Sequence, residues 1–172
     1  MNYYVVETDK HKLIQKTAGV KARQDVETIF KWNNFKKIEI PCLIEGRENK
    51  TRLGKIKAHY DVYMLWKNAL KKIKKNDWIY IQFPLLEHTM LFSLLIKNLE
   101  KRGIHTSIII HDVEAIRFTL RNDVPLSRKI RMRFEEISSF KNCSKIIVHN
   151  EKMKSFMHEK WKIHKDKMDI LG

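Results

Sequence analysis

Ile108-Ile109-Ile110-His111-Asp112-Val113-Glu114-Ala115-Ile116-Arg117 is a stretch in which an apolar run ends abruptly in polar residues. Three consecutive isoleucines are too few for a membrane-spanning helix and too apolar for a strand with one exposed face. They predict the end of a strand that is buried on both faces, as in a parallel sheet. In open α/β sheets, ligands bind outside the carboxyl ends of the strands. The polar residues that follow Ile110 are therefore candidate site residues.

Asp112 and Arg117 each have a functional and a structural interpretation. Asp112 could act as a general base or bind a hydroxyl group, and Arg117 could hold a phosphate or a carboxylate. Alternatively, Asp112 caps the following turn or helix and Arg117 pairs with a surface acid. The residues alone leave both interpretations open.

The rest of the chain alternates short β-rich runs with helical patterns. The β-rich runs cover residues 3–7, 35–40, 78–84, 104–111 and 145–150, and residues 168–172 begin another. The helical patterns cover residues 21–33, 53–73, 87–101, 127–140 and 151–161, and the aromatic residues of 53–73 are expected in the core. This alternation predicts right-handed βαβ crossovers and an α/β fold: a Rossmann-like, doubly wound parallel sheet with helices on both faces.

Polar residues at the ends of several predicted strands should meet at one edge of such a sheet. The groups are Gln82-Phe83-Pro84, His111-Asp112 and His149-Asn150, each of which ends or follows a strand. The loop over residues 17–23, which contains Gly19, Lys21 and Arg23, should lie at the same edge. Its backbone N–H groups, with Lys21 or Arg23, would suit an anion. An ordinary connection for this loop, and a structural role for His149, are the alternatives.

The composition predicts one globular domain with anionic partners. The 172 residues are 43% hydrophobic and carry a net charge of +15. Such a field favours phosphate-bearing substrates, acidic lipid head groups or nucleic acid, although many lysines also suit solvated helix ends. The two cysteines, Cys42 and Cys143, form no CxxC motif, and no apolar run is long enough to span a membrane. We expect reduced thiols and a cytoplasmic protein.

Several common catalytic motifs are absent from the sequence. There is no G-x-G-x-x-G after the first strand, no H-E-x-x-H and no G-x-S-x-G, and Gly54-Lys55 lacks the Ser or Thr that a P-loop requires. These absences disfavour a dehydrogenase, a zinc protease, an α/β-hydrolase and an NTPase. No cluster of residues has metal-ligand spacing, so neither a metal nor another cofactor is expected.

Three segments and one dipeptide together resemble a family of bacterial sugar transferases. The segments are Ala18-Gly19-Val20-Lys21-Ala22-Arg23-Gln24-Asp25-Val26-Glu27, Ile110 to Arg117, and Ile146-Ile147-Val148-His149-Asn150-Glu151-Lys152-Met153, and the dipeptide is Phe83-Pro84. The family includes β-1,6-galactofuranosyltransferases and the streptococcal glucosyltransferase that extends glycans on serine-rich adhesins. The matches follow the family's order from residue 18 to residue 153.

The resemblance implies a GT-B glycosyltransferase, with two Rossmann-like domains and a cleft between them. Residues 1–172 would form the N-terminal, acceptor-binding domain, and a separate C-terminal domain would bind the nucleotide-sugar donor, expected to be a UDP-sugar. The acceptor would be a glycan, glycolipid or glycoprotein in cell-surface polysaccharide or glycan synthesis. Without the donor domain, the chain alone is expected to be inactive.

The resemblance also assigns roles to the residues of the predicted edge. In an inverting transfer, Asp112 or His111 would take the proton of the acceptor hydroxyl. Arg117 or Lys21 would contact phosphate. The remaining cleft residues would be Gly19, Arg23, Phe83, Pro84, His149 and Asn150.

The alternative is a basic, non-enzymatic module that binds nucleic acid or an anionic membrane surface. The charge supports it, but the sequence contains no recognised nucleic-acid-binding motif, so nucleic acid is not an expected partner. Contact with the periphery of the membrane and association with a second copy of the chain both stay open.

Overall fold

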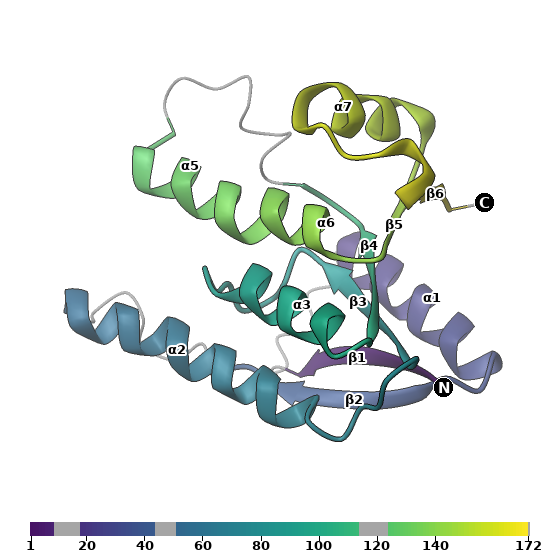
Figure 1. Cartoon of the computed structure of the whole chain (residues 1–172), viewed down its shortest axis with the longest axis horizontal. Helices are drawn as coiled ribbons and strands as arrows, with labels where there is room; N and C mark the ends of the chain where they lie inside the picture. Colours follow the sequence, from purple (N-terminus) through teal and green to yellow (C-terminus); the bar gives the residue numbers. More distant parts are fainter. Residues whose placement is uncertain (9–17, 44–50, 114–123, 172) are drawn as a thin grey trace.

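A computed structural model describes residues 1–8, 18–43, 51–113 and 124–171 as an α/β domain (Figure 1). The strands are β1 (Asn2–Thr8), β2 (Lys36–Pro41), β3 (Trp78–Phe83), β4 (His105–Ile110), β5 (Lys145–Val148) and β6 (Met168–Ile170). The helices are α1 (Ala18–Trp32), α2 (Arg52–Ala69), α3 (Phe92–Lys101), α5 (Leu126–Met132), α6 (Ser138–Asn142) and α7 (Glu151–Trp161). A π-helical turn, η1 (Arg133–Ile137), joins α5 to α6, and a 3₁₀ turn, η2 (Lys165–Lys167), precedes β6.

The six strands form one parallel sheet in the order β2-β1-β3-β4-β5-β6. The chain moves from β1 to β2 in one direction and from β3 to β6 in the other, so the order reverses between β1 and β3. This is the topological switch point, where open α/β sheets bind ligands. The predicted Rossmann-like fold is confirmed.

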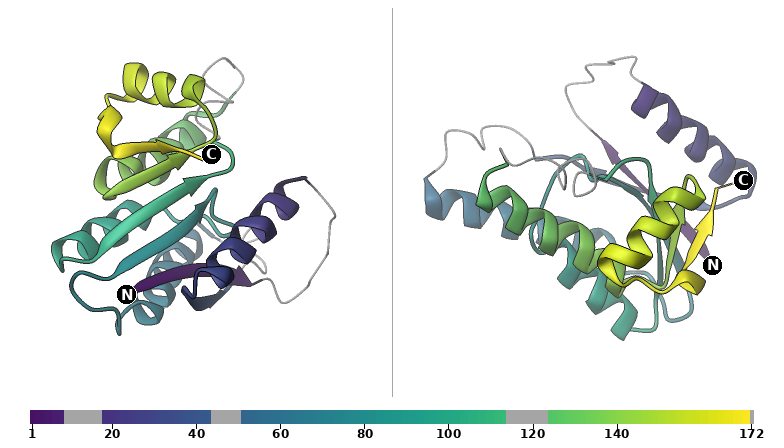
Figure 2. Two further views of the ribbon diagram at one scale, coloured as in Figure 1. Left: turned by 90° about the vertical axis from the view of Figure 1, so that its right-hand side faces the viewer. Right: turned by 90° about the horizontal axis from the view of Figure 1, so that it is seen from above.

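The helices cover the two faces of the sheet unequally (Figure 2). On one face, α1 packs Val26 and Phe30 against Tyr4 and Ile109 of the sheet. On the other face, α2, α3, the α5–α6 run and α7 pack over a larger core. The apolar character of β4 follows from this arrangement, because Ile108 and Ile110 face the larger core while Ile109 faces α1.

The centre of the larger core is aromatic. Phe83 at the end of β3 lies edge-on to Phe140 of α6, with ring centroids 5.2 Å apart. Phe140 also stacks on Trp161 of α7 at 6.1 Å, and Trp66 of α2 lies edge-on to Phe92 of α3 at 5.3 Å. These contacts fix the helices of this face to the sheet and to each other.

Two helix boundaries follow from local chemistry. Asn150 begins α7, because its side chain accepts a hydrogen bond from the Met153 N–H at 2.9 Å. Gly103 follows α3 with φ +73°, a conformation that glycine adopts without steric cost. A Cβ atom at Gly103 would also lie 2.8 Å from Lys75 Cγ.

Three sequence expectations need correction. The helix expected over 87–101 begins only at Phe92, because Glu87 and His88 are held by tertiary contacts of their side chains. Gly19 lies in α1 and not in a loop, since this helix already begins at Ala18.

The third correction concerns Tyr60 of α2, which was expected in the core with the other aromatic residues of 53–73. Tyr60 is exposed, whereas Tyr63 and Trp66 are buried as expected. Leu53 and Ile56 are exposed as well, and the first turns of α2 extend past the edge of the sheet (Figure 1). No helix in the described ranges is both long enough and apolar enough to cross a membrane.

We predict that Phe140→Ala lowers the free energy of unfolding by about 3–5 kcal/mol, because it empties a fully buried aromatic site. Phe134→Ala is the matched control: Phe134 lies in the same helical run but is 51% exposed, so the change should stay within about 0.5 kcal/mol. Urea unfolding measures both. Equal losses for the two variants would contradict the core described above.

Candidate functional site

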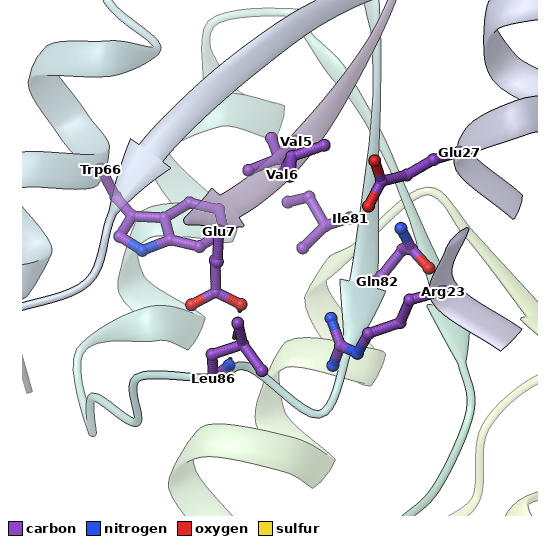
Figure 3. Close-up of a pocket in the computed structure, with 9 residues that line it drawn as sticks. All are labelled: Val5, Val6, Glu7, Arg23, Glu27, Trp66, Ile81, Gln82 and Leu86. Carbon is purple, nitrogen blue, oxygen red and sulfur yellow. Dashed lines mark hydrogen bonds between the residues drawn. The ribbon is translucent and has the colours of Figure 1, made fainter. Parts of the chain in front are cut away.

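A pocket lies where β1 and β3 separate at the switch point (Figure 3). The two strands pair only from Asn2↔Trp78 to Tyr4↔Tyr80, and then diverge. The space between them holds about 320 Å³, part of which is open to solvent. It is lined by Val5, Val6, Glu7, Arg23, Glu27, Trp66, Ile81, Gln82 and Leu86.

Two acids line this pocket, Glu7 from β1 and Glu27 from α1, and Glu7 has a strongly altered pKa. Its carboxylate accepts hydrogen bonds from the backbone N–H of Leu86 at 2.8 Å and of Glu87 at 3.2 Å. Burial raises the pKa of Glu7 to about 7, although these two donors and the charge of Arg23 lower it in part. A carboxyl group with a pKa near neutral pH can both accept and release a proton under physiological conditions.

Arg23 brings positive charge from α1 to the same space (Figure 3). Its guanidinium donates a hydrogen bond to the Pro84 carbonyl oxygen, which ties α1 to the end of β3. Burial lowers the pKa of Arg23, and the carboxylates of Glu7 and Glu27 oppose that change. A guanidinium remains charged at any physiological pH and offers five N–H donors. The pocket therefore pairs a proton acceptor with a fixed cation.

Gln82 and His111 extend the polar edge from β3 to β4. The Nε2 atom of His111 lies 2.7 Å from the Gln82 Oε1 atom, and the His111 backbone N–H donates to the Phe83 carbonyl at 2.8 Å. Burial, with the positive charges of Arg23 and His149, lowers the pKa of His111 to about 4. The imidazole is therefore neutral at pH 7, with Nε2–H donating to Gln82. Its Nδ1 atom is buried without a hydrogen-bond partner among the described residues.

The residues beyond β4 lie further from the pocket. The ring of His149 is 5.9 Å from that of His111 and exposed, and Asn150 caps α7 as described above. Asp112 accepts a hydrogen bond from the Val113 N–H at 2.8 Å. This contact is with the adjacent backbone N–H, and the turn or helix that Asp112 was expected to cap lies outside the described residues.

The structure separates the remaining predicted site residues. Phe83 is fully buried, so its side chain packs in the core beneath the carboxyl edge of the sheet. The Pro84 carbonyl lies at that edge, where it accepts the hydrogen bond from Arg23. Lys21 is exposed in α1 and only two residues from Arg23, so the two side chains leave the helix on nearly opposite sides. Gly19 lies in the first turn of this helix. Arg117 lies outside the described residues.

Sequence reasoning placed Gln82 at this edge but missed Glu7, although Glu7 stands at the end of a predicted strand. Glu7 is a single acid after an apolar run, which is a weak signal without knowledge of the strand order. The strand order makes Glu7 a stronger candidate, because the switch point places the end of β1 beside the opening in the sheet. Among the described residues, no three His, Cys, Asp or Glu side chains gather to hold a metal ion.

The site thus consists of an acid, a cation and a histidine–glutamine pair at the carboxyl edge of a Rossmann-like sheet. The family model described as glucosyltransferase 3-like, N-terminal domain, matches residues 2–171. The chain belongs to this family. No curated protein gives a significant match. Membership in the glucosyltransferase 3-like family confirms the resemblance at the level of an N-terminal glucosyltransferase domain, and links the chain to glycosyl transfer between a sugar donor and an acceptor.

We predict that Glu7 and His111 give opposite contributions to the pH dependence of stability. The raised pKa of Glu7 stabilises the fold below about pH 4.5, and this contribution is lost as the pH rises to about 7. The lowered pKa of His111 acts in the other direction: its contribution is complete above about pH 6.5 and is lost as the pH falls to about 4. In the native protein the two slopes largely cancel where they overlap.

Single variants should reveal each slope. Relative to the native chain, Glu7→Gln should gain stability as the pH rises from 4.5 to about 7, and His111→Asn should lose stability from about 4 to 6.5. Urea midpoints measured over this pH range test both. Curves that run parallel to that of the native chain would contradict the assigned environments.

Proposed function

We propose that this chain is the acceptor-binding domain of a GT-B glycosyltransferase that transfers a sugar from a UDP-sugar to a glycan, glycolipid or glycoprotein. Family membership supports the sugar transfer. The pocket at the β1/β3 switch point is the observation that supports placing the site there, because it holds a carboxyl group of pKa about 7 beside the partly buried guanidinium of Arg23. A second domain, which supplies most of the donor site, completes the proposed enzyme.

In the proposed transfer, Glu7 acts as the general base. The acceptor hydroxyl gives its proton to the Glu7 carboxylate while its oxygen bonds to the anomeric carbon of the donor sugar. The bond from that carbon to the diphosphate oxygen breaks, and UDP leaves with the electron pair. A base is most effective when its pKa lies near the working pH, a condition that Glu7 meets.

The contacts favour Glu7 over the two bases that the sequence suggested. The Nε2 atom of His111 is committed to Gln82, and its Nδ1 atom is buried. With a pKa of about 4, His111 is also a weak base. Asp112 accepts from its neighbouring backbone N–H. We therefore assign His111 and Gln82 to positioning, with Asp112 as a secondary candidate.

Arg23 is the proposed electrostatic partner of the reaction. Its charge lies at the pocket, where it would attract a phosphate or the oxygen atoms of an acceptor sugar. Its hydrogen bond to the Pro84 carbonyl fixes the position of the guanidinium. Lys21 and Arg117 remain sequence-based candidates for phosphate contact, and His149 and Asn150 remain candidates for acceptor contact.

Substitution of Glu7 in the chain joined to its donor domain tests the base. We predict that Glu7→Gln lowers kcat by about 10²–10⁴-fold, because the proton acceptor is lost, while the donor KM changes little. Glu27→Gln is the matched control, since Glu27 lines the same pocket from α1. Product formation measured as released UDP gives both parameters. A Glu7→Gln enzyme with native kcat would refute the role of Glu7.

Donor binding by the chain alone tests the division of labour between the domains. We predict that titration calorimetry shows weak or no binding of UDP-glucose and UDP-galactose to these 172 residues, with activity appearing only when the donor domain is joined. Tight binding of a UDP-sugar, or its rapid hydrolysis by the chain alone, would contradict an acceptor domain.

A further inference from the structure

The outer surface of three neighbouring helices carries an unusual number of exposed apolar side chains. Helix α3 packs against α2 on one side and against the η1–α6 run on the other. Both α2 and α5 extend beyond the sheet in the same direction (Figures 1 and 2). Of the fifteen large hydrophobic residues that are exposed in the described chain, seven belong to these helices: Leu53, Ile56, Tyr60, Leu94, Leu126, Ile130 and Phe134.

The run from α5 into η1 carries an apolar stripe on the face opposite to its buried face. Leu126, Ile130 and Phe134 recur every four residues, so they form one stripe along the helix. They are 72%, 41% and 51% exposed. Met132 and Glu135 lie on the opposite face and are buried in the domain. The inner face packs the helix onto the domain. The exposed apolar stripe on the outer face plays no part in that packing and therefore needs another explanation.

Helix α2 repeats this arrangement in its first turns. Leu53, Ile56 and Tyr60 share one exposed face, while Val62 and Trp66 lie in the core. The first turns of α2 and of α5 extend past the sheet (Figure 1), and both carry exposed apolar side chains.

Basic residues flank the apolar stripes. The three helical runs contain eleven Lys and Arg residues: Arg52, Lys55, Lys57, Lys67, Lys97, Lys101, Arg128, Lys129, Arg131, Arg133 and Lys141. They contain four acids, which offset this charge only in part, because Asp61 and Glu135 each pair with one of these cations. Glu135 and Glu136 are buried, Glu100 accepts hydrogen bonds from Thr106 and Ser144, and Asp61 pairs with Lys57.

We propose that this surface, formed by the outer faces of α2, α3 and α5–η1, docks on an anionic phospholipid bilayer. Apolar side chains would enter the boundary between head groups and acyl chains, and the flanking Lys and Arg residues would contact lipid phosphates. Because α2 and α5 begin at the carboxyl edge of the sheet, docking would also hold the pocket of the proposed function close to the membrane.

The charge distinguishes a membrane from a protein partner or a nucleic acid. Protein interfaces are depleted in lysine at their apolar centres, whereas basic residues beside an apolar stripe are typical of helices that lie on membranes. Nucleic acid would account for the basic residues but not for the exposed Leu126, Ile130 and Phe134.

Sedimentation of the 172-residue chain with lipid vesicles tests the proposal directly. We expect binding to vesicles in which about a third of the lipid is phosphatidylglycerol, and little binding to pure phosphatidylcholine. Ile130→Ser with Phe134→Ser should weaken the binding about tenfold or more. Lys129→Ser with Arg133→Ser should weaken it about 25-fold, since each basic residue contributes about fivefold.

The matched control is Ile29→Ser with Trp32→Ser, which removes exposed apolar residues from α1 on the other face of the sheet. This variant should bind within about twofold of the native chain. All substituted residues are exposed, and an unchanged urea midpoint confirms that each variant is folded.

Three results would overturn the proposal. They are the absence of binding to anionic vesicles, equal losses for the α1 and α5 variants, and binding of duplex DNA that depends on Lys129 and Arg133 but not on Ile130 and Phe134. None of these results bears on sugar transfer, so failure of the docking surface is distinguishable from failure of the proposed function.

Discussion

The separation of β1 from β3 is the constraint on which the site depends. β1 pairs with β2 as far as Thr8↔Pro41, and β3 pairs with β4 as far as Phe83↔Ile110. Between them, β1 and β3 pair only as far as Tyr4↔Tyr80. Each strand thus follows its own outer neighbour, and the sheet opens at its carboxyl edge. The residues that follow the last paired position line the opening, and Glu7 and Gln82 are among them.

Both helical layers contribute to this opening. α1, from the sparsely covered face, supplies Arg23, and the segment between β3 and α3 supplies the N–H groups that hold Glu7. A hydrogen bond between Gln82 and His111 then extends the polar edge from β3 to β4. The environment of Glu7 therefore arises from parts of the chain that are distant in sequence. Its pKa depends on the way in which they pack together.

The sequence predicted the fold more completely than the site, for a physical reason. Buried strands and the cap at Asn150 are local features, so the composition and spacing of nearby residues are enough to predict them. The Glu7 environment is not local, because the donors that hold it lie about eighty residues away. The exposed Tyr60 of α2 shows the same limit: its spacing is that of a core residue, and only the extent of the sheet determines whether a core lies beneath it.

The π-helical turn between α5 and α6 has a consequence for the phase of the whole helical run. Met132 and Phe140 are eight residues apart, which in a regular α-helix would place them roughly 80° apart around the axis. A π turn accommodates one extra residue, so the second half of the run is rotated back by roughly 100° and both side chains point inward. A regular α-helix with the same number of residues would therefore turn Phe140 away from Phe83, whereas the deletion of one residue from Arg133–Ile137 would make the helix regular and leave Phe140 facing Phe83.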